Sequence, residues 1–136
     1  MTSFPLKIVT PDGLEFDGMA ERVTVRTTTG DIGIMAGHMN CVAPLGMGQA
    51  TIVTEGQRKT AAAIGGMLSV LDGKVTLVCT TFEWADEIDV NRVLASEKRA
   101  QKILADKTSS DTDVRLAEAR MKRALIRKSV AGNKFM

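Results

Sequence analysis

The pattern of apolar and polar residues in the first two thirds of the chain predicts short strands separated by turns. In Glu21–Thr27, Val23 and Val25 fall on one side of an extended backbone and polar residues on the other, a pattern typical of a half-buried strand. Two pairs, Glu55–Gly56 and Asp72–Gly73, separate further β-rich runs and favour tight hairpin turns whose central residues take positive φ. Many short strands at this spacing predict an antiparallel β-sandwich or flattened barrel. The runs beside the two turns are Ala50–Thr54, Arg58–Ala62, Met67–Leu71 and Lys74–Thr80.

The C-terminal part of the chain changes to a helical period. At about 100° per residue, one set of apolar residues shares a side of a first helix and another set shares a side of a second. The turn Lys107–Asp113 separates the helices, Ser110 and Asp113 resemble a capping box, and Gly132 is well placed to end the second helix. The first set is Val90, Val93, Leu94, Ala100 and Leu104, and the second is Val114, Ala117, Met121, Ala124 and Leu125.

Small residues indicate how closely these two helices pack. Ala117, Ala124 and Ala131 recur every seven residues, which permits a close antiparallel approach. Both apolar seams are narrow, however, and Glu97 and Lys128 interrupt them. We therefore expect a two-helix hairpin that gains little from burial and is able to move.

Charge and glycine divide the chain at the same place as the period does. Residues 1–86 carry six basic and nine acidic side chains, whereas residues 87–136 carry twelve basic and seven acidic ones. Eleven of the twelve glycines and all three prolines precede residue 87. A shift of this kind marks a boundary near Asp86. The chain is therefore predicted to consist of a β-sandwich domain, residues 1–86, and a helical hairpin domain, residues 87–136.

Composition excludes several classes of function. One histidine and two cysteines 38 residues apart, Cys41 and Cys79, do not form a metal-ligand cluster, and we interpret both as buried, reduced thiols. No phosphate-binding glycine loop or nucleophile elbow is present, so little supports an enzyme. No signal peptide or membrane-spanning run is found either, which predicts no direct membrane insertion.

The basic C-terminal region leaves one alternative open, a nucleic-acid-binding module. Four Phe and one Trp provide few platforms for stacking bases, and the predicted sandwich is acidic. The expectation is therefore no nucleic-acid partner.

Three segments resemble a known family. The segment GDIGIMAGH, Gly30–His38, is similar to the GELGI-x-x-GH turn of ATP synthase epsilon subunits. VTPDGLEFDG upstream resembles the first hairpin of that family, and GGMLSVLDGKVTLVCTTFEWADEID downstream resembles its Gly-Gly strand pair and the acidic lead into its hairpin. Asn40 departs from the family, which commonly has proline there, and Met67 replaces a frequent aromatic residue or Ile. The similarity extends over essentially the whole chain in the same order.

The resemblance implies a rotor subunit of the central stalk of an F-type ATP synthase. It implies contacts with the gamma subunit and the membrane ring of c subunits, a peripheral position on the cytoplasmic side of the cell membrane, and no catalysis or required cofactor. Asp31 and His38 match positions facing the ring and gamma. We expect Gly30, Gly33 and Gly37 to form an exposed loop that presents Asp31, or else a tight β-arch.

The resemblance also implies ATP as a regulatory ligand. Ile88, Asp89 and Arg92 match the Ile-Asp-x-x-Arg-Ala start of the family's nucleotide site, whereas Val93 departs from it. We expect Arg92 to lie on the side of its helix opposite the apolar seam. A solvated, salt-bridged helix face remains the alternative interpretation. The other positions that resemble nucleotide contacts are Glu83, Arg99, Arg123 and Arg127.

A second role implied for the hairpin is inhibition of ATP hydrolysis. In the family, the second helix can extend into the alpha/beta catalytic hexamer and meet an acidic loop of beta. Basic side chains of the second helix would supply the complementary charge. These residues are Arg120, Lys122, Arg123, Arg127 and Lys128.

Overall fold

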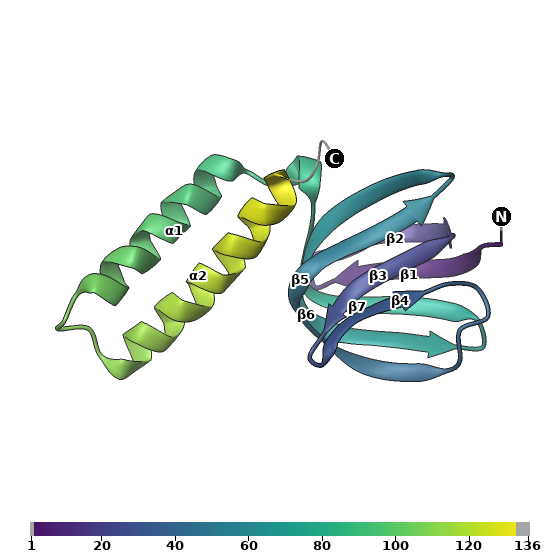
Figure 1. Cartoon of the computed structure of the whole chain (residues 1–136), viewed down its shortest axis with the longest axis horizontal. Coiled ribbons are helices and arrows are strands. Elements are labelled where there is room, and N and C mark those ends of the chain that lie inside the picture. Colours follow the sequence, from purple (N-terminus) through teal and green to yellow (C-terminus); the bar gives the residue numbers. More distant parts are fainter. Residues whose placement is uncertain (1, 133–136) are drawn as a thin grey trace. The chain divides into compact units, whose positions relative to one another are not determined.

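The computed structural model describes residues 2–132, which form two compact units divided between Trp84 and Ala85. The first unit contains only strands and the second contains only helices and their connections (Figure 1). Each unit is described below by itself.

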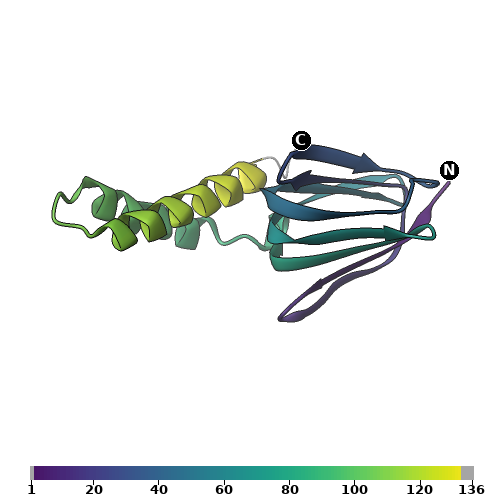
Figure 2. The same ribbon diagram turned by 90° about the horizontal axis from the view of Figure 1, so that it is seen from below.

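Seven strands of the first unit form one continuous sheet in the order β2-β1-β7-β6-β5-β3-β4. Neighbouring strands are antiparallel except for β1 and β7, which are parallel. The sheet curls on itself, so that β3–β4 and β1–β2 lie in opposite layers (Figure 2). A β-sandwich is thus confirmed. The strands are β1 (Phe4–Thr10), β2 (Gly13–Ala20), β3 (Arg22–Thr27), β4 (Gly30–Ile34), β5 (Cys41–Thr54), β6 (Gln57–Leu71) and β7 (Lys74–Trp84).

Alternation along the strands produces the core between the layers. In β3, Val23 and Val25 are completely buried and Arg22 and Arg26 are exposed, as the period of two predicts. Inward residues of every strand join them in one hydrophobic cluster, which is mostly aliphatic and includes Phe4 and Phe82. Its largest fully buried side chains include Leu6, Ile8, Ile34, Ile52, Leu68 and Leu77.

The two predicted hairpin turns are confirmed by their backbone angles. Glu55 and Gly56 have φ of 52° and 73°, and Asp72 and Gly73 have φ of 50° and 79°. The runs between the turns are longer than expected, because the two short runs predicted before and after the glycine pair at 65–66 belong to one strand, β6. Both glycines have positive φ, which bends the strand without shifting its register with β5 or β7.

Among the described glycines, Gly66 leaves the least room for a side chain. A Cβ atom at this position would lie 1.8 Å from the carbonyl oxygen of Val78 on β7. No side chain fits such a space, and the φ of 124° is itself strained for any residue except glycine. The curvature of β6 against β7 therefore requires glycine at position 66.

The two cysteines are free thiols in different environments. Cys79 lies in the core, where burial, with a smaller contribution from the charge of Glu15, raises the pKa of its thiol to about 11. Cys41, at the start of β5, is only partly buried. The expectation of a buried thiol is thus confirmed for Cys79 and holds in part for Cys41.

The second unit is an antiparallel helical hairpin. It comprises a short 3-10 turn, η1 (Ala85–Glu87), followed by α1 (Val90–Ala105) and α2 (Asp111–Gly132). The hydroxyl of Ser110 accepts a hydrogen bond of 3.1 Å from the amide of Asp113, which confirms the serine half of the predicted capping box. Asp106 closes the end of α1 by accepting bonds from the Thr108 hydroxyl and amide, and these bonds lower the pKa of its carboxyl. Within residues 2–132, no helix has the length and apolar character needed to cross a membrane.

The seam between the helices is built from small residues. Ala117, Ala124 and Ala131 are all buried, as their seven-residue spacing predicts, and Ala100 faces them from α1. Val93 is also buried in the seam. Four larger members of the expected seam lie at its edges, since alanine contacts bring the backbones close and leave wide side chains outside. Val90, Leu94, Leu104 and Leu125 are between 38% and 49% exposed.

Replacement of Gly66 by alanine is expected to destabilise the sandwich strongly. The added Cβ would collide with a backbone oxygen that cannot move alone, so we expect a loss of roughly 3 kcal/mol or more in the free energy of unfolding. Gly13→Ala is the matched control, because Gly13 also has a large positive φ, 134°, but no atom within 4 Å of its Cβ position. Urea unfolding followed by circular dichroism compares the two. Equal losses would show that backbone angle, rather than close approach, determines the requirement.

Candidate docking and regulatory sites

Asp31 lies in a strand rather than in the loop predicted from its glycine-rich surroundings. It is the second residue of β4 and is paired across the sheet with Arg26 of β3. The expected loop and the expected β-arch are both wrong for this segment, since Gly30–Ile34 forms a regular hairpin with β3. Gly33 does not adopt positive φ, whereas Gly30 and Gly37 do. The hairpin presents Asp31 more rigidly than a loop would.

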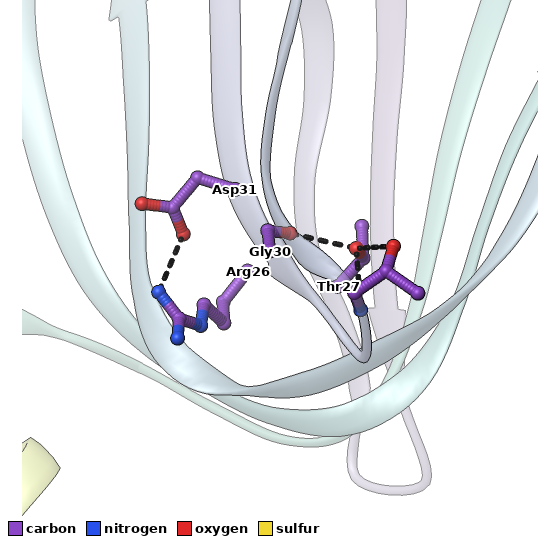
Figure 3. Close-up of polar contacts among 5 residues, drawn as sticks. Arg26, Thr27, Gly30 and Asp31 are labelled. Carbon is purple, nitrogen blue, oxygen red and sulfur yellow. Dashed lines mark hydrogen bonds and ion pairs between the residues drawn. The ribbon is translucent and has the colours of Figure 1, made fainter.

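The carboxylate of Asp31 forms an ion pair with its cross-strand neighbour. Asp31 Oδ1 lies 3.5 Å from Arg26 Nη1, and both side chains are more than half exposed (Figure 3). The register of a hairpin places residues directly opposite one another close enough for such pairs. Arg26 was not predicted to be part of this site. The sequence did contain a signal for it, because Arg26 lies in a predicted strand that ends three residues before Gly30, so a hairpin at that point would bring it opposite Asp31.

His38 belongs to the connection between β4 and β5. Its Nδ1 is 2.8 Å from the carbonyl oxygen of Met39, and its amide donates to the carbonyl of Met35. In the same connection, the side-chain oxygen of Asn40 accepts a 2.9 Å bond from the amide of Asp72. Asn40, which stands where the family commonly has proline, thus ties this connection to the β6–β7 turn.

A row of apolar side chains crosses the outer surface of the sheet. Strand register places one residue from each of five adjacent strands side by side, and each row member alternates with residues that point into the core. Leu14, Met67 and Val78 are 58%, 43% and 50% exposed. Contiguous exposed apolar surface of this kind is typical of an interaction site. The row, called the apolar row below, consists of Leu14, Val9, Val78, Met67 and Pro44.

The candidate nucleotide residues are divided between the two units. Glu83 belongs to β7 of the sandwich, and the other six belong to the helical unit. Asp89 is the N-cap of α1, and its carboxylate accepts a 3.2 Å bond from the amide of Arg92. Ile88 is buried beside it in the chain. Asp89 therefore has a structural role whether or not it meets a nucleotide.

The arginines of the hairpin flank its seam. Arg92 and Arg99 are exposed and each directly precedes a buried residue, Val93 or Ala100. The expectation that Arg92 lies opposite the seam is therefore wrong. At about 100° per residue, Arg123 of α2 occupies the equivalent flank of its own helix. The structure thus gathers arginines along one side of the hairpin, a suitable surface for a polyanion.

The five basic residues proposed for inhibition do not form a single cluster. Arg120, Arg123 and Arg127 recur at helical spacing on one flank of α2, and Lys122 and Lys128 fall on the other. Lys128 Nζ is paired with Glu97 Oε2 at 3.4 Å, and the Glu97 side chain is only 13% exposed. The two residues predicted to interrupt the seam thus neutralise one another across it. Within residues 2–132, no group of three or more His, Cys, Asp or Glu side chains is arranged to hold a metal ion.

Two family models match consecutive parts of the chain. The β-sandwich domain of the ATP synthase delta/epsilon chain matches residues 3–85, and the long α-helix domain of the same chain matches residues 86–132. The ATP synthase epsilon chain of Bacillus velezensis is 44% identical over 133 residues, covering 98% of this chain and 100% of the relative. That of Ruminococcus albus is 40% identical over 135 residues, with 98% and 100% coverage.

Solved structures show the same fold at lower identity. A chain of the Euglena gracilis mitochondrial ATP synthase, in a structure of its OSCP, F1 and c-ring, superposes with a TM-score of 0.82 at 20% identity, over 95% of this chain and 81% of that one. A chain from the central stalk and c-ring of the Tetrahymena thermophila enzyme gives 0.60 at 16% identity, over 93% and 95%.

A curled β-sandwich followed by an alanine-seamed helical hairpin defines a two-domain stalk-type subunit. The chain belongs to the ATP synthase delta/epsilon chain family, as an epsilon subunit of the F-type enzyme. The resemblance found in the sequence is confirmed. Family membership favours the ATP synthase subunit over the alternative left open by the sequence, a nucleic-acid-binding module.

Proposed function

We propose that this chain works in the central stalk as a non-catalytic coupling subunit, peripheral to the membrane, whose sandwich docks on gamma and on the c-ring and whose hairpin regulates hydrolysis. The observation that carries the proposal is the apolar row. Four of its members are exposed on a rigid sheet and Val9 is partly exposed. Burying them against a partner would remove apolar surface from water at little conformational cost.

The two surfaces of the sandwich suit different partners. The apolar row favours a large, permanent protein contact, and we assign it to gamma. The Asp31–Arg26 pair is polar and exposed, and the connection beside it combines His38 with the exposed side chains of Met35 and Met39. We assign both segments to the polar loops of the ring. A subunit that holds both partners at once transmits rotation between them.

Val78→Lys is expected to weaken binding to purified gamma by roughly tenfold or more, because it places a charge in the centre of an apolar contact. The melting temperature should change little, since the Val78 side chain is 50% exposed in the free chain. Leu125→Lys is the matched control, with the same change in charge at a hairpin residue that is 49% exposed. Surface plasmon resonance with the full-length variants measures the affinities. Equal affinity for the two variants would reject the apolar row as the gamma site.

For the hairpin we propose ATP as a regulatory ligand rather than a required cofactor. The arginine flank supplies bidentate donors for phosphate groups, and bound ATP would bridge Arg92, Arg99 and Arg123 and hold the hairpin folded. The valine at 93 is buried in the seam, so its extra methyl groups relative to alanine act on helix packing and need not contact the nucleotide.

Calorimetric titration of the full chain with ATP, with and without magnesium, is expected to show binding in about the millimolar range or tighter. Arg99→Ala should weaken it by roughly tenfold, because a charge-assisted bond to phosphate is lost. Arg115→Ala removes an equal charge from an exposed position near the start of α2, outside the arginine flank, and should leave the affinity unchanged. Absence of heat at millimolar nucleotide would end the proposal.

Inhibition of hydrolysis would use the same flank of α2. An acidic loop of the catalytic hexamer would meet Arg120, Arg123 and Arg127, and Lys122 and Lys128 would contribute from the other flank. The alanine seam gives α2 little apolar surface to lose when it leaves α1, so separation of the helices costs less than in a leucine-packed hairpin.

Deletion of residues 88–136 is expected to raise the ATP hydrolysis of the reconstituted enzyme while binding to gamma is retained. A milder variant, Arg120→Ala with Arg123→Ala, should raise it in part by removing charge without removing the helix. Steady-state hydrolysis of the enzyme carrying each variant measures the effect, with Arg115→Ala as the control for charge. Unchanged hydrolysis after the deletion would show that this hairpin is not inhibitory.

A further inference from the structure

The aliphatic stem of Arg26 lies close against the strand beside it. A Cβ atom at Gly48 of β5 would lie 2.6 Å from the Cβ of Arg26 and 3.0 Å from its Cγ, and one at Gly46 would lie 3.6 Å from the Cγ. Two residues without side chains thus leave a shelf on β5, and the aliphatic stem of Arg26 occupies it. A long side chain packed in this way loses much of its freedom before any partner binds.

The backbone beneath Asp31 is fixed by a second set of contacts. The buried hydroxyl of Thr27 donates a 2.6 Å bond to the carbonyl of Gly30 and accepts one from the amide of Thr29 (Figure 3). The amide of Thr28 donates to the carbonyl of Pro44 on β5. The turn that precedes Asp31 is therefore tied both to itself and to the neighbouring strand, so the carboxylate stands on a rigid support.

The ion pair uses only part of the bonding capacity of its two groups. Within residues 2–132, Asp31 Oδ2 has no hydrogen-bond partner, and the guanidinium of Arg26 makes one contact, the ion pair of its Nη1 with Asp31 Oδ1. An exposed pair of this kind contributes little to stability. The glycine shelf and the threonine-locked turn are therefore an arrangement that fixes the pair in place rather than one that gains stability from it.

We propose that Arg26 is a positioning residue for the docking surface of β4. It holds Asp31 Oδ1, directs Oδ2 outward and offers its remaining N–H groups next to it. The partner that fits is a polar loop presenting one hydrogen-bond donor and one acceptor side by side. A partner group with only a positive or only a negative charge would be a poor match. This inference rests on the proposed contact of Asp31 with the c-ring and deepens it, because it makes Arg26 and the glycine shelf part of the recognition.

The test uses the full chain and two preparations of the ATP synthase stripped of its own copy. One is the membrane complex with its ring, and the other is the soluble catalytic part with gamma but no ring. Arg26→Ala, Gly48→Ala and Asp31→Asn should each weaken binding to the ring-containing complex by roughly three- to tenfold. None of the three should change the affinity for the ring-free part. Arg22→Ala, an exposed arginine of the same strand, should alter neither.

A charge reversal separates positioning from a merely structural role. The combined Arg26→Asp and Asp31→Arg variant restores a cross-strand ion pair, so its melting temperature should equal that of the unchanged chain. Its binding to the ring-containing complex should remain weak, because the outward donor and acceptor have exchanged places. Full recovery of binding would overturn the proposal.

The single variants distinguish this inference from the function on which it rests. If Asp31→Asn weakens ring-dependent binding and Arg26→Ala does not, Asp31 acts without Arg26 and the positioning role is rejected. If neither variant has an effect, the ring contact of Asp31 fails, and the inference fails with it. Additive losses in the Arg26→Ala, Asp31→Asn double variant would also reject it, since a positioned pair must show coupling.

Discussion

The sandwich depends on one constraint, the burial of aliphatic side chains between two layers of a single curled sheet. Only four Phe and one Trp are available, so the layers close mainly over Val, Ile, Leu and Ala, with Phe4 and Phe82 among them. Small residues such as Ala50 and Ala61 are fully buried and let the layers approach. The closure also requires Gly66, where the backbones of β6 and β7 come too close for any side chain. The curvature of the sheet and the positions of its outward-facing residues follow from this packing.

The docking surfaces are a consequence of the same packing. Alternation that buries Leu68 and Leu77 must expose Met67 and Val78 on the other side of the same strands. The apolar row runs from β2 to Pro44 on β5, and the β3–β4 hairpin follows directly beside it at the end of the strand order. One rigid domain can thus offer an apolar contact and a polar contact to two partners without changing its shape.

The helical hairpin follows a different energetic rule. A buried leucine stabilises a fold by roughly 1.5–3 kcal/mol, but the seam here consists mainly of alanines, and leucines such as Leu94 and Leu125 remain exposed. The Glu97–Lys128 pair adds one polar link across it. A unit with so little apolar burial opens at low free energy, which suits a regulatory element.

Local rules determined much of this protein. Alternation predicted the buried face of β3, Glu-Gly and Asp-Gly pairs predicted turns with positive φ, and seven-residue spacing predicted the alanine seam, because each depends only on neighbours along the chain. Which residues of different strands lie side by side was decided by the tertiary structure alone. The apolar row draws on strands from Leu14 to Val78, and Arg26 meets Asp31 and Gly48 through two different pairings. Such contacts arise only when long-range burial sets the register.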